Sequence, residues 1–188
     1  VKIGTQETSF ALTTVPRLFT WEWEEACGGN AQICLTFSFP GTLVLSFASL
    51  MPADNLGGWR ADVVEKLKEA APSVVRFPGG CFVSFYNWES SIGDRDRREP
   101  QPSFYWGGLE ENDVGLDEFL QLSQLVGFEP QLCFNMMTSE PFKARQMVEY
   151  LNAPENVGMG RLRMQNGHKE PYGVRLFEMD NEPGRKWT

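Results

Sequence analysis

The feature that most constrains the fold of this chain is a change of hydrophobic period near residue 52. Before it, apolar residues recur at every second position in "ICLTFSF" and "LVLSF". After it, stretches with apolar residues at helical spacing alternate with short apolar runs. A period of two is typical of strands with one buried face, and helix–strand alternation is typical of a parallel sheet. The sequence therefore predicts an α/β chain preceded by an antiparallel β segment.

The first part, residues 1–52, is predicted to be antiparallel. A hairpin is expected from residues 33–39 and 43–47, which a "PGT" turn joins, with alternate side chains on one buried face. The stretch "FTWEWEEA", residues 19–26, alternates in the same way. Strands joined by turns without a helix indicate the C-terminal part of a β-sandwich domain of the carbohydrate-binding kind, with its other strands elsewhere.

The second part, residues 53–188, is predicted to be the N-terminal part of a (β/α)8 TIM barrel. Amphipathic helices are expected over residues 60–71, 116–125 and 141–151, and the runs "SVVRF", "QLCFN" and "VRLFEM" are the expected strands. Residues 152–173 are glycine-rich and predicted to be a loop. A closed barrel has eight strands and about 250 residues, so this part holds less than half of one.

The remaining barrel strands are expected from the rest of the same gene product, from another chain or from a second copy. Three parallel strands leave two open edges, and open edges recruit partners or aggregate. The barrel interior is expected to receive the side chains of Val74, Leu132, Phe134 and Leu176. We therefore expect the 188-residue chain alone to be unstable or associated with another polypeptide.

Charge and hydropathy exclude several classes of protein. The formal net charge is −8, with 17 basic and 25 acidic residues, whereas a nucleic-acid binder needs clustered Lys and Arg. The one dense basic run, "RDRRE", is interleaved with acids, which predicts local ion pairs. No apolar run approaches the roughly 20 residues of a membrane span. We expect neither nucleic acid nor a membrane as partner.

The histidine and cysteine content argues against a metal site and against triad chemistry, and no cofactor is expected. His168 is the single histidine, so neither a histidine-rich metal site nor a Ser–His pair can be built from this chain. Its setting, "NGHKEPY", favours a loop-holding role. The four cysteines show no metal-ligand spacing; free buried thiols are expected, with a Cys27–Cys34 bridge as the alternative. The compartment stays open.

The strongest candidate for chemistry is Glu182, just past the end of the last expected strand. An arbitrary loop glutamate is usually only solvated, but here Asn181 precedes it and can hydrogen-bond a substrate hydroxyl beside the acid. Parallel strands bring their carboxyl ends to one face, where barrel enzymes carry their active sites. Glu178 and Asp180 bracket the strand end and are expected to support the fold or the site.

Arg76 is the second candidate, because a charged residue lies within the apolar run "VVRFPGG". It pairs either with a structural carboxylate inside the barrel or with a catalytic carboxylate that it keeps ionised. Both interpretations stay open. Asn135 ends the middle strand and is expected to line the cleft. Trp88, Tyr105 and Trp106 suit a sugar site because sugar rings stack on aromatic faces, although each suits packing beneath the loop equally.

Three longer motifs, in order, resemble the family 51 α-L-arabinofuranosidases, which are retaining glycosidases with a (β/α)8 barrel. The first is the region that contains "RFPGGCFV"; the others are "WGGLEENDVGLDEF" and "GRLRMQNGHKEPYGVRLFEMDNE". The resemblance runs from about Phe37 to Trp187 and identifies the expected strands as barrel strands two, three and four.

The resemblance also implies roles for individual residues. Glu182 corresponds to the family's general acid/base, and Asn181 to its contact with the sugar 2-hydroxyl. Arg76 resembles the arginine that orders the catalytic carboxylates. Cys81 stands where the family has Asn or Cys, with a backbone that can reach the sugar, and Trp106 resembles an aromatic wall of the site. The family's nucleophile is a second glutamate on strand seven, which this chain does not reach.

The expected function is therefore release of terminal α-L-arabinofuranosyl residues from arabinose-containing saccharides. The chain is expected to carry the acid/base without the nucleophile and to be inactive alone, because the retaining mechanism needs two carboxyl groups about 5–5.5 Å apart. Two alternatives are another retaining glycosidase of the same clan and a non-catalytic carbohydrate-binding or scaffold fragment.

Overall fold

A computed structural model describes residues 1–24, 32–38, 40–45 and 48–183. The chain divides into two compact units, Val1–Ala53 and Asp54–Thr188. Cys27, Phe39 and Phe47, which belong to the predicted disulfide and the predicted hairpin, lie outside the described residues.

The first unit contains much less strand than expected. Its described strands are β1 (Lys2–Ile3), β2 (Gln6–Glu7) and β3 (Ile33–Cys34), and β1 pairs antiparallel with both others. The predicted hairpin is wrong for residues 35–38 and 43–45, which form no strand, and the predicted strand is wrong for residues 19–24. Apolar alternation requires a second layer to bury it, and Ile33 and Phe37 stay 52% and 54% exposed.

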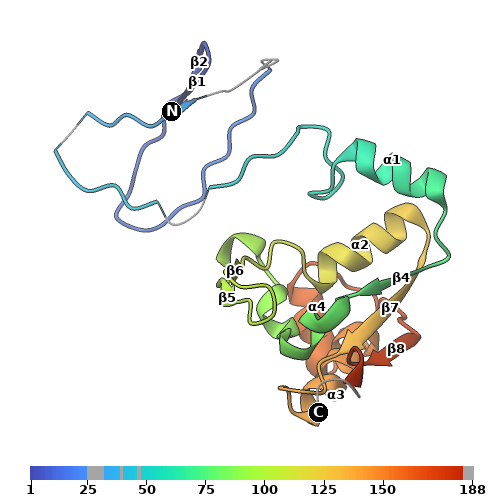
Figure 1. Cartoon of the computed structure of the whole chain (residues 1–188). Coiled ribbons are helices and arrows are strands. Elements are labelled where there is room, and N and C mark those ends of the chain that lie inside the picture. The colour runs from blue at the N-terminus through green and yellow to red at the C-terminus, as the bar shows by residue number, and fades with distance from the viewer. Residues whose placement is uncertain (25–31, 39, 46–47, 184–188) are drawn as a thin grey trace. The chain divides into compact units, whose positions relative to one another are not determined.

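The second unit is organised around a parallel sheet, as expected. Its strands are β4 (Val74–Phe77), β7 (Glu129–Phe134) and β8 (Leu176–Met179), in the order β4-β7-β8 (Figure 1). The register pairs Arg76 with Gln131 and Cys133 with Glu178. The strands therefore follow chain order across the sheet, and their carboxyl ends lie at one edge.

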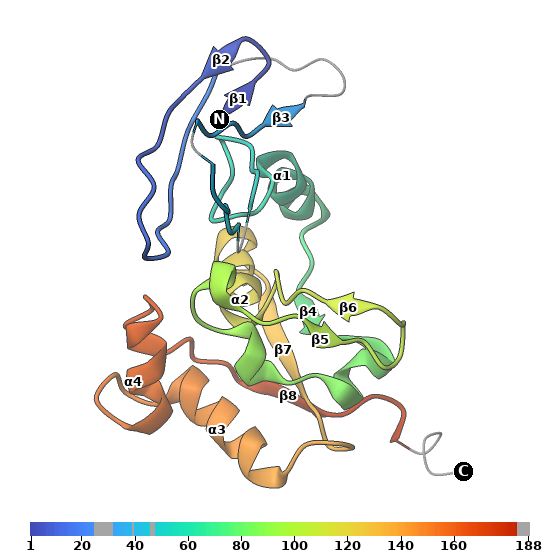
Figure 2. The same cartoon turned by 90° about the vertical axis from the view of Figure 1, so that its left-hand side faces the viewer.

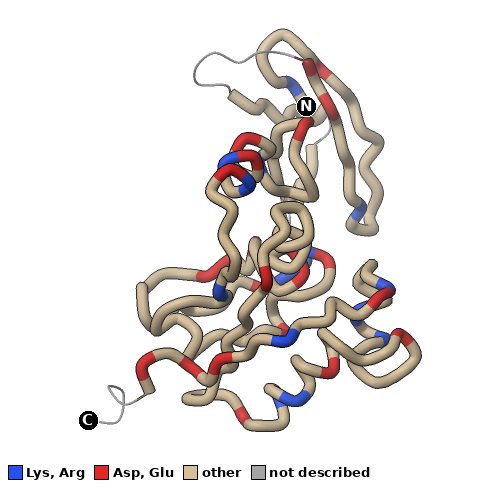
Figure 3. Tube along the Cα trace, turned by 90° about the vertical axis from the view of Figure 1, so that its right-hand side faces the viewer, with Lys and Arg blue, Asp and Glu red and all other residues tan. Residues whose placement is uncertain are grey.

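The helices fall where their apolar spacing predicts them. They are α1 (Ala61–Ala70), α2 (Leu116–Val126) and α3 (Pro141–Asn152). Helix α2 ends at Gly127, whose φ of +93° is a left-handed cap that glycine adopts readily. Helix α3 begins with proline, which needs no hydrogen-bond partner there. Acidic and basic residues are interspersed along α1 (Figure 3).

The two faces of the sheet differ in polarity, and this corrects one expectation. Leu132 and Phe134 are buried in the core with α2 and α3, so they face the helices and not a barrel interior. Phe134 stacks on Phe177 with ring centroids 5.1 Å apart. Val74 and Leu176 do lie on the opposite face, where they remain 46% and 38% exposed. Along each strand, residues of that face alternate with residues of the core face, and the polar residues of the strands lie on it.

The long loop after β4 is more ordered than its composition suggests. It contains three 3₁₀ helices, Gly80–Phe85, Trp88–Ser91 and Arg95–Arg97, and a hairpin of β5 (Gln101–Pro102) and β6 (Leu109–Glu110). Gly115 allows this loop to approach α2, since a Cβ there would lie 1.7 Å from the Ser91 carbonyl oxygen. Trp88 donates to the Lys143 carbonyl at 3.1 Å and packs on Tyr150, which supports packing over sugar stacking for this residue.

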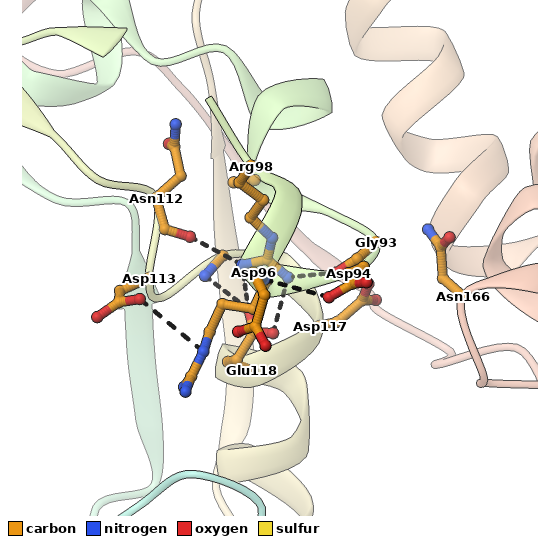
Figure 4. A network of polar contacts seen from close by, with 12 residues as sticks. Gly93, Asp94, Asp96, Arg98, Asn112, Asp113, Asp117, Glu118 and Asn166 are labelled. Carbon is orange, nitrogen blue, oxygen red and sulfur yellow. Dashed lines mark hydrogen bonds and ion pairs between the residues drawn. The ribbon is translucent and has the colours of Figure 1, made fainter. Parts of the chain in front are cut away.

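The predicted ion pairing of the basic run is confirmed. Arg98 donates to both oxygens of Glu118 at 2.8 and 2.9 Å (Figure 4). Arg95 pairs with Asp113, and Arg97 pairs with Asp94. The Arg98 side chain is almost fully buried and also donates to two backbone carbonyls, those of Gly93 and Asn112. The run thus clamps its own loop onto the first turn of α2.

The region predicted as a glycine-rich loop contains a further helix, α4 (Gly158–Gln165), which lies beside α3 (Figure 2). Arg163 of α4 is completely buried. Its guanidinium donates to the carbonyls of Tyr150 at 2.6 Å, His168 at 3.2 Å and Lys169 at 3.0 Å. His168 stacks on Tyr172, in keeping with a loop-holding role. No apolar stripe predicted α4, because a buried arginine organises this helix.

Replacing Arg163 with methionine should lower the free energy of unfolding by about 2–4 kcal/mol. Three carbonyls would lose their donor inside the protein, and an unsatisfied buried acceptor costs about 1–3 kcal/mol. Guanidinium-induced unfolding measures the change. The matched control is Arg161→Met, in the same helix and exposed, which should change the free energy by less than about 0.5 kcal/mol. Equal effects of the two substitutions would contradict the role of Arg163.

Asp117 gives the second unit a pH dependence. Burial raises the pKa of its carboxyl, although the hydroxyls of Tyr150 and Tyr172, which donate to it at 2.8 and 2.9 Å, act in the opposite direction. A carboxyl with a raised folded-state pKa binds its proton more tightly in the folded protein than in the unfolded chain. Its contribution to stability is present below its ordinary pKa and is lost as the pH rises through the folded-state pKa.

Asp117→Asn should therefore flatten the dependence of unfolding free energy on pH in the range above the ordinary pKa of an aspartate, about 4. Urea unfolding at several pH values measures this slope. Asp54→Asn, at an exposed position, should keep the wild-type slope. An unchanged slope in Asp117→Asn would show that this carboxyl does not titrate differently in the folded state.

Candidate active site

A polar cluster occupies the face of the sheet that points away from the helices. Arg76 of β4 reaches across β7 and donates to both oxygens of Glu178 on β8, at 3.1 and 3.2 Å. Gln131 and Cys133 of β7 donate to the second of these oxygens at 3.2 and 3.3 Å. A structural carboxylate and a catalytic carboxylate were the two partners expected for Arg76. In the structure Arg76 pairs with Glu178, a carboxylate within a strand. From the sequence, Glu178 was expected to support the fold or the site.

The same guanidinium also holds the Asn181 side chain. Arg76 donates to the Asn181 amide oxygen at 3.3 Å, and the Asn181 amide nitrogen donates to the Cys81 sulfur at 3.4 Å. Because an arginine can only donate, it decides which end of the amide faces it. The structure therefore brings Asn181 together with Arg76 and Cys81, which lie about a hundred residues earlier in the chain.

Tyr105 extends the cluster toward the aromatic hairpin. A hydrogen bond with the Cys81 side chain raises the pKa of Tyr105, and the charge of Glu182 adds to this rise. Glu182 is exposed and lies near enough to act on the tyrosine. Tyr105 also lines a pocket with aromatic neighbours on the loop after β4, among them Phe82, Phe85 and Phe104. Sequence reasoning left Tyr105 undecided between packing and the site.

Two of the expected site residues, Asn135 and Trp106, have surroundings that differ from those of the polar cluster. The amide of Asn135 donates to the Tyr86 carbonyl and the Thr138 hydroxyl, and it accepts from the backbone N–H groups of Met137 and Thr138. All four hydrogen-bonding positions of this side chain are thus used within the protein, which favours a loop-holding role over a sugar contact. Trp106 is 74% exposed, and its ring lies edge-on to the ring of Tyr105, with the two ring centroids 5.6 Å apart.

No metal site accompanies the cluster within the residues that the structure describes. No group of three or more His, Cys, Asp and Glu side chains there could hold a metal ion. Nor does any described helix have both the length and the apolar character needed to cross a membrane.

The comparison with known proteins decides the family. The family model described as "Alpha-L-arabinofuranosidase 1 domain" matches residues 66–187. The chain belongs to the α-L-arabinofuranosidase family. Its relatives include the Emericella nidulans protein named "Alpha-L-arabinofuranosidase C", 40% identical over 136 residues, and a Streptomyces lividans protein named "Intracellular exo-alpha-(1->5)-L-arabinofuranosidase", 35% identical over 138 residues. Each of these two matches covers 72% of the chain.

Solved structures of the arabinofuranosidase family agree with this assignment. The enzyme from Thermotoga maritima in complex with arabinose matches 73% of the chain with a TM-score of 0.67 and 36% identity. A family 51 enzyme from Bifidobacterium longum matches 70% with a TM-score of 0.67 and 37% identity. The chain spans only 28% and 26% of those two structures, and 27% and 21% of the Emericella and Streptomyces proteins.

Sequence reasoning missed how the strands' polar residues combine. Arg76, Gln131, Cys133 and Glu178 all alternate with apolar neighbours, so the period of two placed each on the non-core face. That signal was available in the sequence, because parallel pairing in chain order brings such residues side by side. The contacts of Cys81 with Asn181 and Tyr105 had no comparable signal, since they depend on how two loops fold.

The polar cluster predicts a strong difference between two thiols. Cys133 is 2% exposed, and burial, with Glu178 beside it, raises the pKa of its thiol to about 12. Since the thiolate is the reactive form, iodoacetamide at pH 8 should leave Cys133 unmodified in the folded protein and alkylate it after unfolding. Cys81, which is half-buried, is the internal control and should react before Cys133. Peptide mass mapping measures both, and alkylation of Cys133 at the rate of Cys81 would contradict this geometry.

Proposed function

We propose that this chain carries the general acid/base, but not the nucleophile, of a retaining glycoside hydrolase that releases terminal α-L-arabinofuranosyl residues from arabinose-containing saccharides. The observation that carries the proposal is the position of Asn181 and Glu182. They follow β8 after a single intervening residue, Asp180, and Asn181 is held by Arg76 and Cys81 at the carboxyl edge of a parallel sheet. The names of the relatives, which are α-L-arabinofuranosidases, support the substrate class.

In this proposal the sheet β4-β7-β8 corresponds to barrel strands two to four, and the first unit is part of a β-sandwich. Parallel pairing in chain order supports the barrel assignment, because (β/α)8 barrels add their strands in that order. The polar face with Arg76 and Glu178 would then point to the barrel interior. The other strands, with the second catalytic carboxyl group, come from outside these residues.

The mechanism requires two carboxyl groups about 5–5.5 Å apart. The nucleophile attacks the anomeric carbon, while Glu182 gives a proton to the departing oxygen. A glycosyl–enzyme ester results, and Glu182, now a carboxylate, takes a proton from the water that hydrolyses it. The proton that Glu182 gives in the first step is thus returned in the second, so Glu182 ends the cycle as it began.

The neighbouring residues have binding and positioning roles in this proposal. Asn181 contacts the sugar 2-hydroxyl, and Arg76 sets the orientation of its amide. Cys81 accepts from that amide and presents its backbone to the sugar. Trp106, which is largely exposed, offers an aromatic face beside Tyr105 against which a sugar ring can pack.

Replacing Glu182 tests the proposal in the full-length natural protein. Glu182→Ala should reduce turnover of arabinofuranosides with poor leaving groups by about 10²–10⁴-fold, the usual contribution of a general acid, and should affect activated aryl arabinofuranosides much less at the first step. Azide should accelerate the variant on activated substrates, because a small anion attacks the glycosyl–enzyme without needing a general base. The glycosyl azide formed should retain the substrate's anomeric configuration.

Glu65→Gln provides the matched control, since Glu65 is an exposed glutamate of α1 away from the cluster. It should keep the wild-type rate on all leaving groups. Loss of activity in Glu182→Ala that is equal for all leaving groups and unaffected by azide would rule out the acid/base role.

A further inference from the structure

The turn after β8 has an uncommon backbone at the two residues that flank Asn181. Asp180 has φ of +59° and Glu182 has φ of +46°, both in the left-handed region. Residues other than glycine adopt this conformation at a cost in free energy and keep it only where their surroundings hold them. Something in the structure must therefore fix this turn.

The side chain of Asp180 supplies that hold. It is 4% exposed, and one carboxylate oxygen accepts from the Ser84 hydroxyl and, at 2.7 Å, from the Asn181 backbone N–H. The other oxygen accepts from the Met136 backbone N–H at 2.9 Å. The Asp180 backbone N–H donates to the Phe134 carbonyl at 2.9 Å.

These donors come from three different loops. Ser84 belongs to the loop after β4, Met136 follows β7, and Asn181 follows β8. One carboxylate thus ties the carboxyl ends of three parallel strands together. Hydrogen bonds to an ionised acceptor are roughly twice as strong as those between neutral groups.

We propose that Asp180 is a positioning residue that holds Asn181 and Glu182 in their reactive geometry by joining the loops that follow β4, β7 and β8. The inference rests on the proposed function, because it assigns the geometry to a general acid. It goes beyond that function, which gives Asp180 no part in the reaction.

Asp180→Asn is the sharpest variant. Asparagine tolerates the left-handed backbone as aspartate does, so the turn itself remains available. Its NH₂ group is a donor, however, and would face one of the donors that the carboxylate now accepts. Either the Met136 N–H or the Asn181 N–H must then lose its acceptor, because the Ser84 hydroxyl can rotate but a backbone N–H can only donate, while side-chain size is preserved.

The leaving-group dependence of the rate distinguishes positioning from simple stability. In the full-length natural protein, Asp180→Asn should lower kcat by about 10²-fold on the poorest leaving group, since a displacement of about 1 Å can have that effect. The loss should shrink to a few-fold on the most activated aryl arabinofuranoside, which needs no proton. Ser84→Ala, which removes one donor of the three, should cause a smaller loss with the same trend.

Asp117→Asn is the matched control, because Asp117 is also partly buried and bonded to hydroxyls, but those belong to Tyr150 and Tyr172 of the helical layer. It should change the rate by the same factor on every leaving group. A uniform loss in Asp180→Asn, like that of the control, would overturn the proposal.

Hydrogen exchange supplies a readout that needs no activity. Asp180→Asn should speed amide exchange in residues 135–137 and 180–182 by at least about ten-fold, whereas Asp117→Asn should leave both segments unchanged. Unchanged exchange in Asp180→Asn overturns the positioning role. A wild-type protein that hydrolyses no arabinofuranoside would instead reject the proposed function, and the exchange rates would still decide whether Asp180 holds the loops.

Discussion

The guanidinium of Arg76 is the interaction on which the candidate site depends. It spans the sheet from β4 to β8, pairing with Glu178 and holding the amide of Asn181. As an ion pair it contributes little stability, because both side chains are about one-third exposed, at 35% and 33%, and such pairs are worth about 0–1 kcal/mol. Its importance is geometric, since a planar donor with fixed directions sets which way each partner points.

This arrangement needs a sheet with one apolar face that packs on the helices and one face that carries polar side chains. Leu132, Phe134 and Phe177 pack toward the helices and supply the apolar contacts that hold the strands in register. The alternate positions are then free to carry Arg76, Gln131 and Glu178 without disturbing the core. A shift of one residue in the register would exchange the two faces, so the packing of the core also decides the chemistry of the other face.

Loops at the carboxyl edge are held by polar side chains as well as by apolar packing. Asn135 fills all its hydrogen-bonding positions within the protein, and Arg98 clamps the loop after β4 onto α2. Such contacts are directional, so they fix backbone positions near a polar site where apolar side chains would be out of place. Membership in the α-L-arabinofuranosidase family supports the catalytic role that is proposed for the residues at this edge.

The helices α1, α2 and α3, the three parallel strands and the position of Asn181 and Glu182 at a strand end follow from local patterns, because periodicity and strand alternation are written in neighbouring residues. The expected hairpin failed for the opposite reason: alternation shows which face could be buried but not what buries it. Helix α4, built around Arg163, and the pairing of Arg76 with Glu178 were settled only by the tertiary structure. Both depend on groups that no local pattern connects, since no period in the sequence encodes the partner that a buried or bridging charge will find.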